Sequence, residues 1–166
     1  MRAVLLSLLC AVPLSLVAQS HSALALANDG RVRAIFAELL RRGWYGLREA
    51  ESAAFIVLDR TGCYSPVVWA HTGEKGRQTW RGSAPPFAVA IAHTHPKGSK
   101  RPSAVDVRTA GSVGLPVFVL TPTNIWVATP EGRAAPVVEE EEWARTVSSR
   151  GPCVPAKPPR LALSAE

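Results

Sequence analysis

The stretch from 87 to 106, FAVAIAHTHPKGSKRPSAVD, decides how this chain is organised. Its first part, Phe87 to Ala92, is a compact apolar run that predicts a buried strand leading directly to His93. Positions 96–102 are rich in Pro, Gly, Ser and Lys, so a loop is expected after the strand. Two histidines, His93 and His95, therefore stand where a buried strand meets a loop.

A helix is predicted immediately after this loop. Ser103 is a favourable N-cap residue, and Asp106 stands at the third helical position, which is the arrangement of a capping box. The helix is expected to run to about Gly111. The sequence thus brings four polar side chains together within one strand, one loop and one helical turn.

The residues before this stretch predict a helix and a hairpin. Asn28 and Asp29 are N-cap candidates, and apolar residues then recur at three- and four-residue spacing up to Leu40. β-branched and aromatic residues mark the strands that follow. The predicted elements are a helix from Asn28 to Gly43, a strand from Ala53 to Leu58, a returning strand from Val67 to Ala70 and a loop from His71 to Pro86.

The residues after Gly111 predict two strands, Val117 to Leu120 and Ile125 to Ala128, and then a last helix that begins at Pro136. Acidic residues early in that helix and arginines late in it would complement the helix dipole. The order helix, hairpin, strand, helix, strand pair, helix predicts an α/β (α+β layered) domain. The domain is expected to span 28–150, with a Pro-rich tail at 151–166.

The first 27 residues have the pattern of a secretory signal peptide. Arg2 gives a basic start, an apolar run follows up to Val17, and small residues offer cleavage after Ala18 or after Ala27. The mature protein is therefore expected to be exported, to the periplasm or outside the cell. No stable membrane association is expected after cleavage, although a retained anchor helix is the alternative interpretation.

Export changes the interpretation of the cysteines. Cleavage would remove Cys10 and leave Cys63 and Cys153, which are the candidate pair for one disulfide in an oxidising compartment, with two unrelated thiols as the alternative. The net charge of +6 comes from scattered basic residues, and no nucleic-acid-binding pattern is present. We therefore expect no nucleic-acid partner.

The histidine pair has the composition of a metal site. His93 and His95 are two residues apart at a strand end, and this spacing turns both imidazoles to the same face. Asp106 lies one loop away and offers a carboxylate as third ligand. Two histidines and one carboxylate are a ligand set of hydrolytic zinc sites, which keep one position open for water.

The spacing of His93, His95, Ser103 and Asp106 resembles the JAMM motif of the JAB/MPN metalloproteases, and the bacterial JAB domains in particular. The resemblance covers about 45–130. It implies a sandwich similar to that of the cytidine deaminases, with a central mixed sheet flanked by helices. It also implies an active site with one zinc ion per chain.

The resemblance further implies roles for individual residues. Zinc bound by His93, His95 and Asp106 would lower the pKa of a bound water, and a glutamate would serve as general base. Glu51, directly before the strand from Ala53, occupies the place of that glutamate, and Glu49 is the competing candidate. Ser103 is expected to donate a hydrogen bond to the developing oxyanion or to hold the water.

The implied activity is hydrolysis of a peptide or isopeptide amide bond in a peptide or protein substrate. Two alternatives are an inactive binding module and a zinc hydrolase that acts on cell-wall peptides or a toxin target. Trp69, Trp80 and Trp126 are candidates to line a substrate cleft, and core or hairpin packing is expected for at least two of them.

Overall fold

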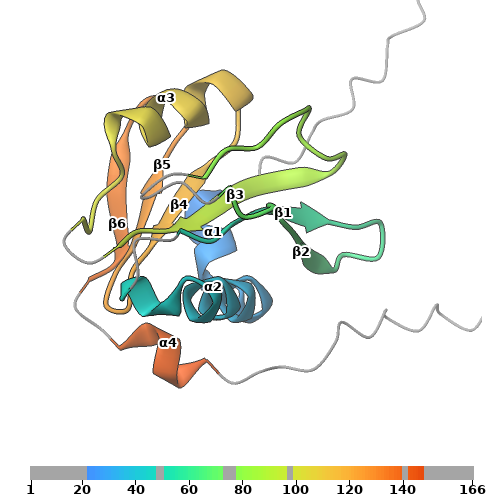
Figure 1. The fold of residues 1–166 in the computed structure, drawn as a ribbon. Coiled ribbons are helices and arrows are strands. Elements are labelled where there is room, and N and C mark those ends of the chain that lie inside the picture. Colours follow the sequence, from blue (N-terminus) through green and yellow to red (C-terminus); the bar gives the residue numbers. More distant parts are fainter. Residues whose placement is uncertain (1–21, 48–50, 73–77, 97–98, 140–141, 148–166) are drawn as a thin grey trace, which may run out of the picture.

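The computed structural model describes 22–47, 51–72, 78–96, 99–139 and 142–147. One sheet of six strands forms its centre, in the order β2-β1-β3-β4-β5-β6 (Figure 1). β3 and β4 are parallel, whereas all other neighbours are antiparallel. The expected α+β architecture, a central mixed sheet with flanking helices, is therefore confirmed.

The elements follow one another along the described ranges, with a short 3₁₀ helix, η1, between α2 and β1. They are α1 (Ala23–Asn28), α2 (Gly30–Arg42), η1 (Trp44–Gly46), β1 (Ala53–Leu58), β2 (Tyr64–Val68), β3 (Ala88–Thr94), α3 (Ala104–Val113), β4 (Val117–Leu120), β5 (Ile125–Ala128), β6 (Ala134–Val138) and α4 (Trp143–Thr146).

One face of the sheet packs against α1, α2 and α4. Phe36 of α2 lies against Phe118 of β4 with 5.0 Å between the ring centroids, and both side chains are fully buried. Trp143 of α4 is also buried, and its indole Nε1 donates a hydrogen bond to the Thr121 carbonyl at 2.9 Å. This face therefore contains the larger part of the apolar core.

The other face of the sheet packs against α3, which lies on the opposite side from α2 and α4 (Figure 1). Phe55, Ile91 and Val117 come from neighbouring strands and form a smaller cluster with Ala110 of α3. Because α3 connects two parallel strands, its first turn lies beside the carboxyl end of β3. The predicted metal ligands therefore lie in β3, in the loop after it and in the first turn of α3.

Capping residues fix the ends of these helices as expected. The Asp29 carboxylate accepts hydrogen bonds from the backbone N–H groups of Arg31 and Val32, and Gly43 ends α2. At α3, Ser103 and Asp106 form the predicted capping box. The helix extends to Val113, two residues beyond the predicted end.

Most predicted strands are present, but the prediction for the last helix was wrong. Pro136 does not start a helix; it lies in β6, the outer strand of the sheet, which pairs only with β5. An outer strand tolerates proline because the missing N–H group is not needed on its solvent side. The helix that does form, α4, begins later, at Trp143.

The N-terminal predictions concern mostly residues outside the described ranges. Positions 1–21 of the predicted signal peptide are among them, as is Cys153, the predicted partner of the buried Cys63. Within the described ranges, every helix is too short or too polar to span a bilayer. Leu26 and Ala27 of α1 are part of the core, with 1% and 0% of their surfaces exposed.

Candidate metal centre

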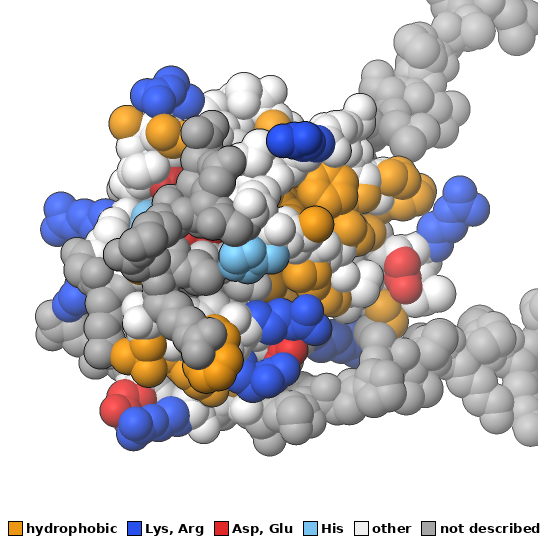
Figure 2. All heavy atoms as spheres, viewed as in Figure 1, with side chains coloured by type: hydrophobic (Ala, Val, Ile, Leu, Met, Phe, Trp, Pro, Cys, Tyr) orange, Lys and Arg blue, Asp and Glu red, His pale blue; other side chains and the backbone are white. Residues whose placement is uncertain are grey.

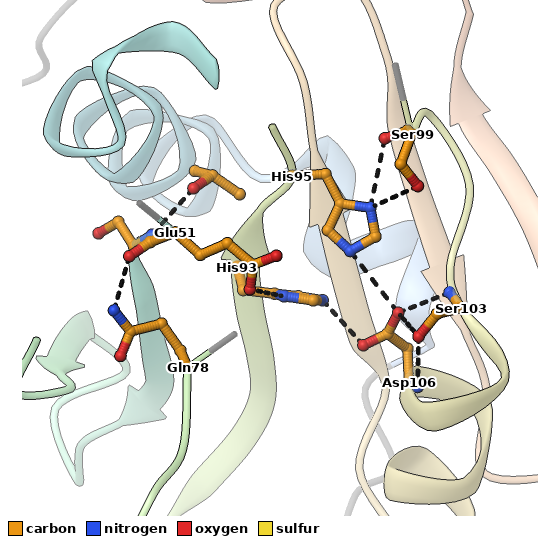
Figure 3. A network of polar contacts seen from close by, with 9 residues as sticks. Glu51, Gln78, His93, His95, Ser99, Ser103 and Asp106 are labelled. Atoms are coloured by element: carbon orange, nitrogen blue, oxygen red, sulfur yellow. Dashed lines mark hydrogen bonds and ion pairs between the residues drawn. The ribbon is translucent and has the colours of Figure 1, made fainter. Parts of the chain in front are cut away.

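Four side chains from three elements meet at one end of the sheet (Figure 3). Glu51 lies just before β1, His93 is in β3, His95 follows β3, and Asp106 is in the first turn of α3. The antiparallel pairing of β1 and β3 brings Glu51 beside His93, although the two residues are far apart in the sequence. All four side chains are buried or nearly so.

His93 lies between the two carboxylates. Its Nδ1 is 3.6 Å from Glu51 Oε2, and its Nε2 is 3.1 Å from Asp106 Oδ1 (Figure 3). Nε2 is buried, yet it makes no well-formed hydrogen bond to any described group. A buried imidazole nitrogen without a hydrogen bond costs free energy unless another partner satisfies it, so this atom is suited to bind a metal.

His95 is held in one orientation by the loop that follows it. Its Nδ1 lies 3.2 Å from both the backbone oxygen and the hydroxyl of Ser99. Because a carbonyl oxygen can only accept, Nδ1 carries the hydrogen, and Nε2 keeps its lone pair. That Nε2 lies 3.7 Å from Asp106 Oδ2, so both histidines direct Nε2 toward the same carboxylate.

Asp106 is oriented by Ser103. Its Oδ2 accepts hydrogen bonds from the Ser103 backbone N–H at 2.6 Å and from the Ser103 hydroxyl at 2.7 Å. In return, the Asp106 N–H donates to the Ser103 oxygen at 3.3 Å. Ser103 therefore lies at the predicted site, but its hydroxyl hydrogen is directed to Asp106. This contact makes it a positioning residue for the carboxylate.

The backbone around Glu51 is fixed by two residues that the sequence did not reveal. The Thr94 hydroxyl accepts a hydrogen bond from the Ser52 N–H at 2.9 Å, and the Gln78 amide donates one to the Glu51 carbonyl at 2.7 Å. Gly43 leaves the room that Thr94 needs, because a Cβ at this position would lie 2.5 Å from the Thr94 hydroxyl. No local pattern signals these contacts, since each joins distant segments.

The charges of the site are strongly coupled. Burial disfavours a charged His93, but the Asp106 and Glu51 carboxylates outweigh burial and raise the pKa of His93 to about 9. Burial, and then the neighbouring His93, lower the pKa of His95. Burial would raise the pKa of Asp106, yet the contacts with His93 and Ser103 hold it well below its usual range. The carboxylates thus favour a positive charge between them.

A divalent cation fits this arrangement. One ligand atom from each of Glu51, His93 and His95 can be chosen so that all three lie within 4.8 Å of one another. Asp106 adds a fourth candidate ligand through its contacts with both histidines. Two imidazoles and two carboxylates are a donor set that zinc accepts. The predicted ligands His93, His95 and Asp106 and the predicted base Glu51 therefore lie together, whereas Glu49 is outside the described residues.

The four side chains open into a pocket of about 790 Å³. Away from the histidines, its wall is mostly apolar and includes Phe55, Trp69 and Trp80. Trp126 lies elsewhere, buried under the guanidinium of Arg101, which is 5.0 Å from its ring centroid. Two of the three tryptophans considered as cleft residues therefore do line the pocket, and they also pack against Phe55.

The chain is similar to a known protein family. A family model described as prokaryotic homologs of the JAB domain matches residues 41–138, more than half of the 166 residues. The matched region contains all four residues of the candidate metal centre. No similar protein was found among the curated proteins or the solved structures.

Proposed function

Since the protein belongs to the family of prokaryotic homologs of the JAB domain, we propose that it is an exported, zinc-dependent hydrolase of peptide or isopeptide amide bonds. The observation that carries this proposal is the buried group of Glu51, His93 and His95, together with Asp106 in contact with both imidazoles. Such a group serves no purpose in packing, and burying it costs free energy unless a partner compensates the charges.

In this proposal His93, His95 and Asp106 hold the zinc, and Glu51 is the general base. When bound, the zinc would lower the pKa of a water and polarise the substrate carbonyl. Glu51 is placed to accept a proton from the attacking water and to return it to the leaving amine. Ser99 and Ser103 act through their neighbours, because they orient His95 and Asp106.

Replacing Glu51 tests this assignment. Glu51→Gln removes the basic oxygen with little change in shape, so hydrolysis should fall by roughly 10²- to 10⁴-fold while bound zinc is kept. The measurements are zinc content and cleavage of a peptide library, with peptidoglycan fragments assayed beside it. Glu38→Gln is the matched control, since Glu38 pairs with Arg41 and Arg42 on the exposed side of α2.

The outcomes separate the hypotheses. Wild-type protein that binds zinc but cleaves no substrate would support a binding module. Cleavage of peptidoglycan fragments alone would favour a cell-wall substrate. Loss of zinc from Glu51→Gln would show that Glu51 is a ligand, as its grouping with the two histidines permits.

Export and the Cys63–Cys153 disulfide are part of the same proposal. The chain-entropy model gives about 4 kcal/mol for closing a loop of about 90 residues. Alkylation of exported protein with and without reductant, followed by mass measurement, tests the pair. Two thiols that react without reductant would exclude the disulfide.

A further inference from the structure

The pocket of the candidate metal centre extends along the sheet, and the residues that line this part are mostly apolar. Three side chains form what we call the aromatic wall, namely Phe55, Trp69 and Trp80. Their ring centroids are 5.2 to 5.8 Å apart, in tilted or edge-to-face contact. Figure 2 shows hydrophobic side chains gathered where β3 begins, with single Lys and Arg side chains around them. Mutual packing of the rings makes this wall rigid.

The aromatic wall is separated from the histidines by one small residue. Ala53 pairs with His93 across β1 and β3, and its carbonyl accepts a hydrogen bond from the backbone N–H of Trp69 at 2.9 Å. Residues that lie opposite each other on two paired strands point to the same face of the sheet. Because alanine has only a methyl group, the space between His93 and the wall stays open for part of a ligand.

Two residues that line this part of the pocket each have a buried polar atom without a hydrogen-bond partner among the described groups. These atoms are the indole Nε1 of Trp69, a donor, and the amide Oε1 of Gln78, an acceptor; both are buried. The other amide atom of Gln78 already binds the Glu51 carbonyl, which fixes the orientation of the side chain. A donor and an acceptor left unpaired beside an apolar wall match the C=O and N–H of one residue in an extended peptide, which point to the same side.

The charges of the pocket also restrict its ligand. Among the described residues that line it, the carboxylates are Glu51 and Asp106, and no Lys or Arg is present. An acidic side chain would be desolvated there with no described Lys or Arg of the pocket wall to pair with. A bulky apolar side chain would instead bury its surface against the aromatic wall.

We propose that this pocket selects a bulky apolar residue, of the size of leucine or phenylalanine, at a position separated by one residue from the scissile amide bond. The side chain packs on the aromatic wall, while Trp69 Nε1 donates to the backbone carbonyl oxygen of that residue and Gln78 Oε1 accepts from its N–H. This specificity rests on the hydrolase function proposed above, but the binding itself does not require zinc or cleavage.

Binding is therefore measured with metal-free Glu51→Gln protein. The probes are blocked alanine hexapeptides in which one central residue is Phe, Leu, Ala or Asp, titrated by calorimetry. The Phe and Leu peptides should bind roughly 10- to 100-fold more tightly than the Ala and Asp peptides, which is the range expected for an apolar specificity pocket. Equal affinity for all four peptides would overturn the proposal.

Two variants separate the two kinds of contact. Trp80→Ala shortens the wall and should reduce the preference for Phe over Ala at least 5-fold. Trp69→Phe keeps a ring but removes the N–H group, so all four peptides should bind about 2- to 10-fold more weakly with their order unchanged. Leu24→Ala is the control, because Leu24 is 60% exposed on α1, on the other face of the sheet. Unchanged affinities in Trp69→Phe would show that the Trp69 indole does not donate a hydrogen bond to the peptide.

Failure of this inference is distinct from failure of the proposed function. Hydrolysis by wild-type protein without preference for apolar residues would leave the hydrolase proposal intact and overturn the subsite. A clear binding preference in a protein that cleaves no peptide would support the subsite and contradict the hydrolase proposal.

Discussion

The Asp106 carboxylate has two tasks in this structure. Its Oδ2 accepts from Ser103 and thereby caps α3, while Oδ1 lies 3.1 Å from His93 Nε2. The start of the helix and the candidate metal centre therefore share one carboxylate. Any change that weakens the cap must also loosen a ligand of the proposed zinc.

Ser103→Ala tests this connection. Loss of the cap should lower the free energy of unfolding by about 1 kcal/mol, and the freed carboxylate should weaken zinc binding by roughly 10- to 100-fold. Chemical denaturation and competition with a zinc chelator measure the two effects. Ser112→Ala, in the last turn of the same helix, is the control. A fall in kcat with unchanged zinc affinity would instead support the oxyanion role that the resemblance implied.

Gly43 acts on the site through Thr94. A Cβ at Gly43 would lie 2.5 Å from the Thr94 hydroxyl, which holds the backbone beside Glu51. Gly43→Ala should therefore cost about 1 to 3 kcal/mol in the free energy of unfolding, as overpacked sites do, and should also lower activity.

The matched control for this variant is Gly111→Ala. There the added Cβ would meet only the Pro130 carbonyl, at an ordinary 3.5 Å. An alanine inside α3 should stabilise the helix by about 0.5 to 1 kcal/mol. Denaturation curves that shift equally for both variants would show that Gly43 has no special contact.

At the scale of elements, local sequence patterns predicted the strands and helices whose bounds depend on residues close to one another in the sequence. β1, β4 and β5 have the predicted bounds because each is an apolar run between turn residues. β6 was missed because its first three residues are exposed and one is Pro136, so only pairing with β5 marks it as a strand. Sequence patterns cannot show such pairing.

The residues of the candidate site also differ in how far the sequence predicted them. His93, His95 and Asp106 were predictable, since they are close in the sequence and share one strand, loop and helix. Glu51 was identified only through a family resemblance, because β-sheet pairing brings it to the site. Gln78 and Thr94 were not identified at all. Their contacts with Glu51 and Ser52 depend on segments 27 and 42 residues away.

For the proposed export, the burial of α1 favours cleavage after Ala18 over cleavage after Ala27. Cleavage after Ala27 would remove Leu26 and Ala27, which are buried in the core, and loss of a buried leucine typically costs about 2 to 5 kcal/mol. If the protein is exported as proposed, its mature form should therefore begin near Gln19, with α1 retained. N-terminal sequencing of the secreted protein tests this, and a mature protein that begins at Asn28 would contradict it.

At the scale of the whole molecule, the two faces of the sheet have different roles. The face against α1, α2 and α4 contains most of the apolar core, and the face against α3 contains the polar cluster and its pocket. The strand pairing fixes the positions of Glu51 and His93, while α3 positions Asp106. The site is thus built on rigid elements, and a metal would link the sheet to α3.

The most direct test of this account is the metal content of the purified mature protein, measured by elemental analysis for wild type, His95→Ala and Glu51→Gln. The account predicts one zinc per protein molecule in the wild type, little or none in His95→Ala, and one again in Glu51→Gln. Wild-type protein without stoichiometric zinc, or His95→Ala with as much zinc as wild type, would contradict it.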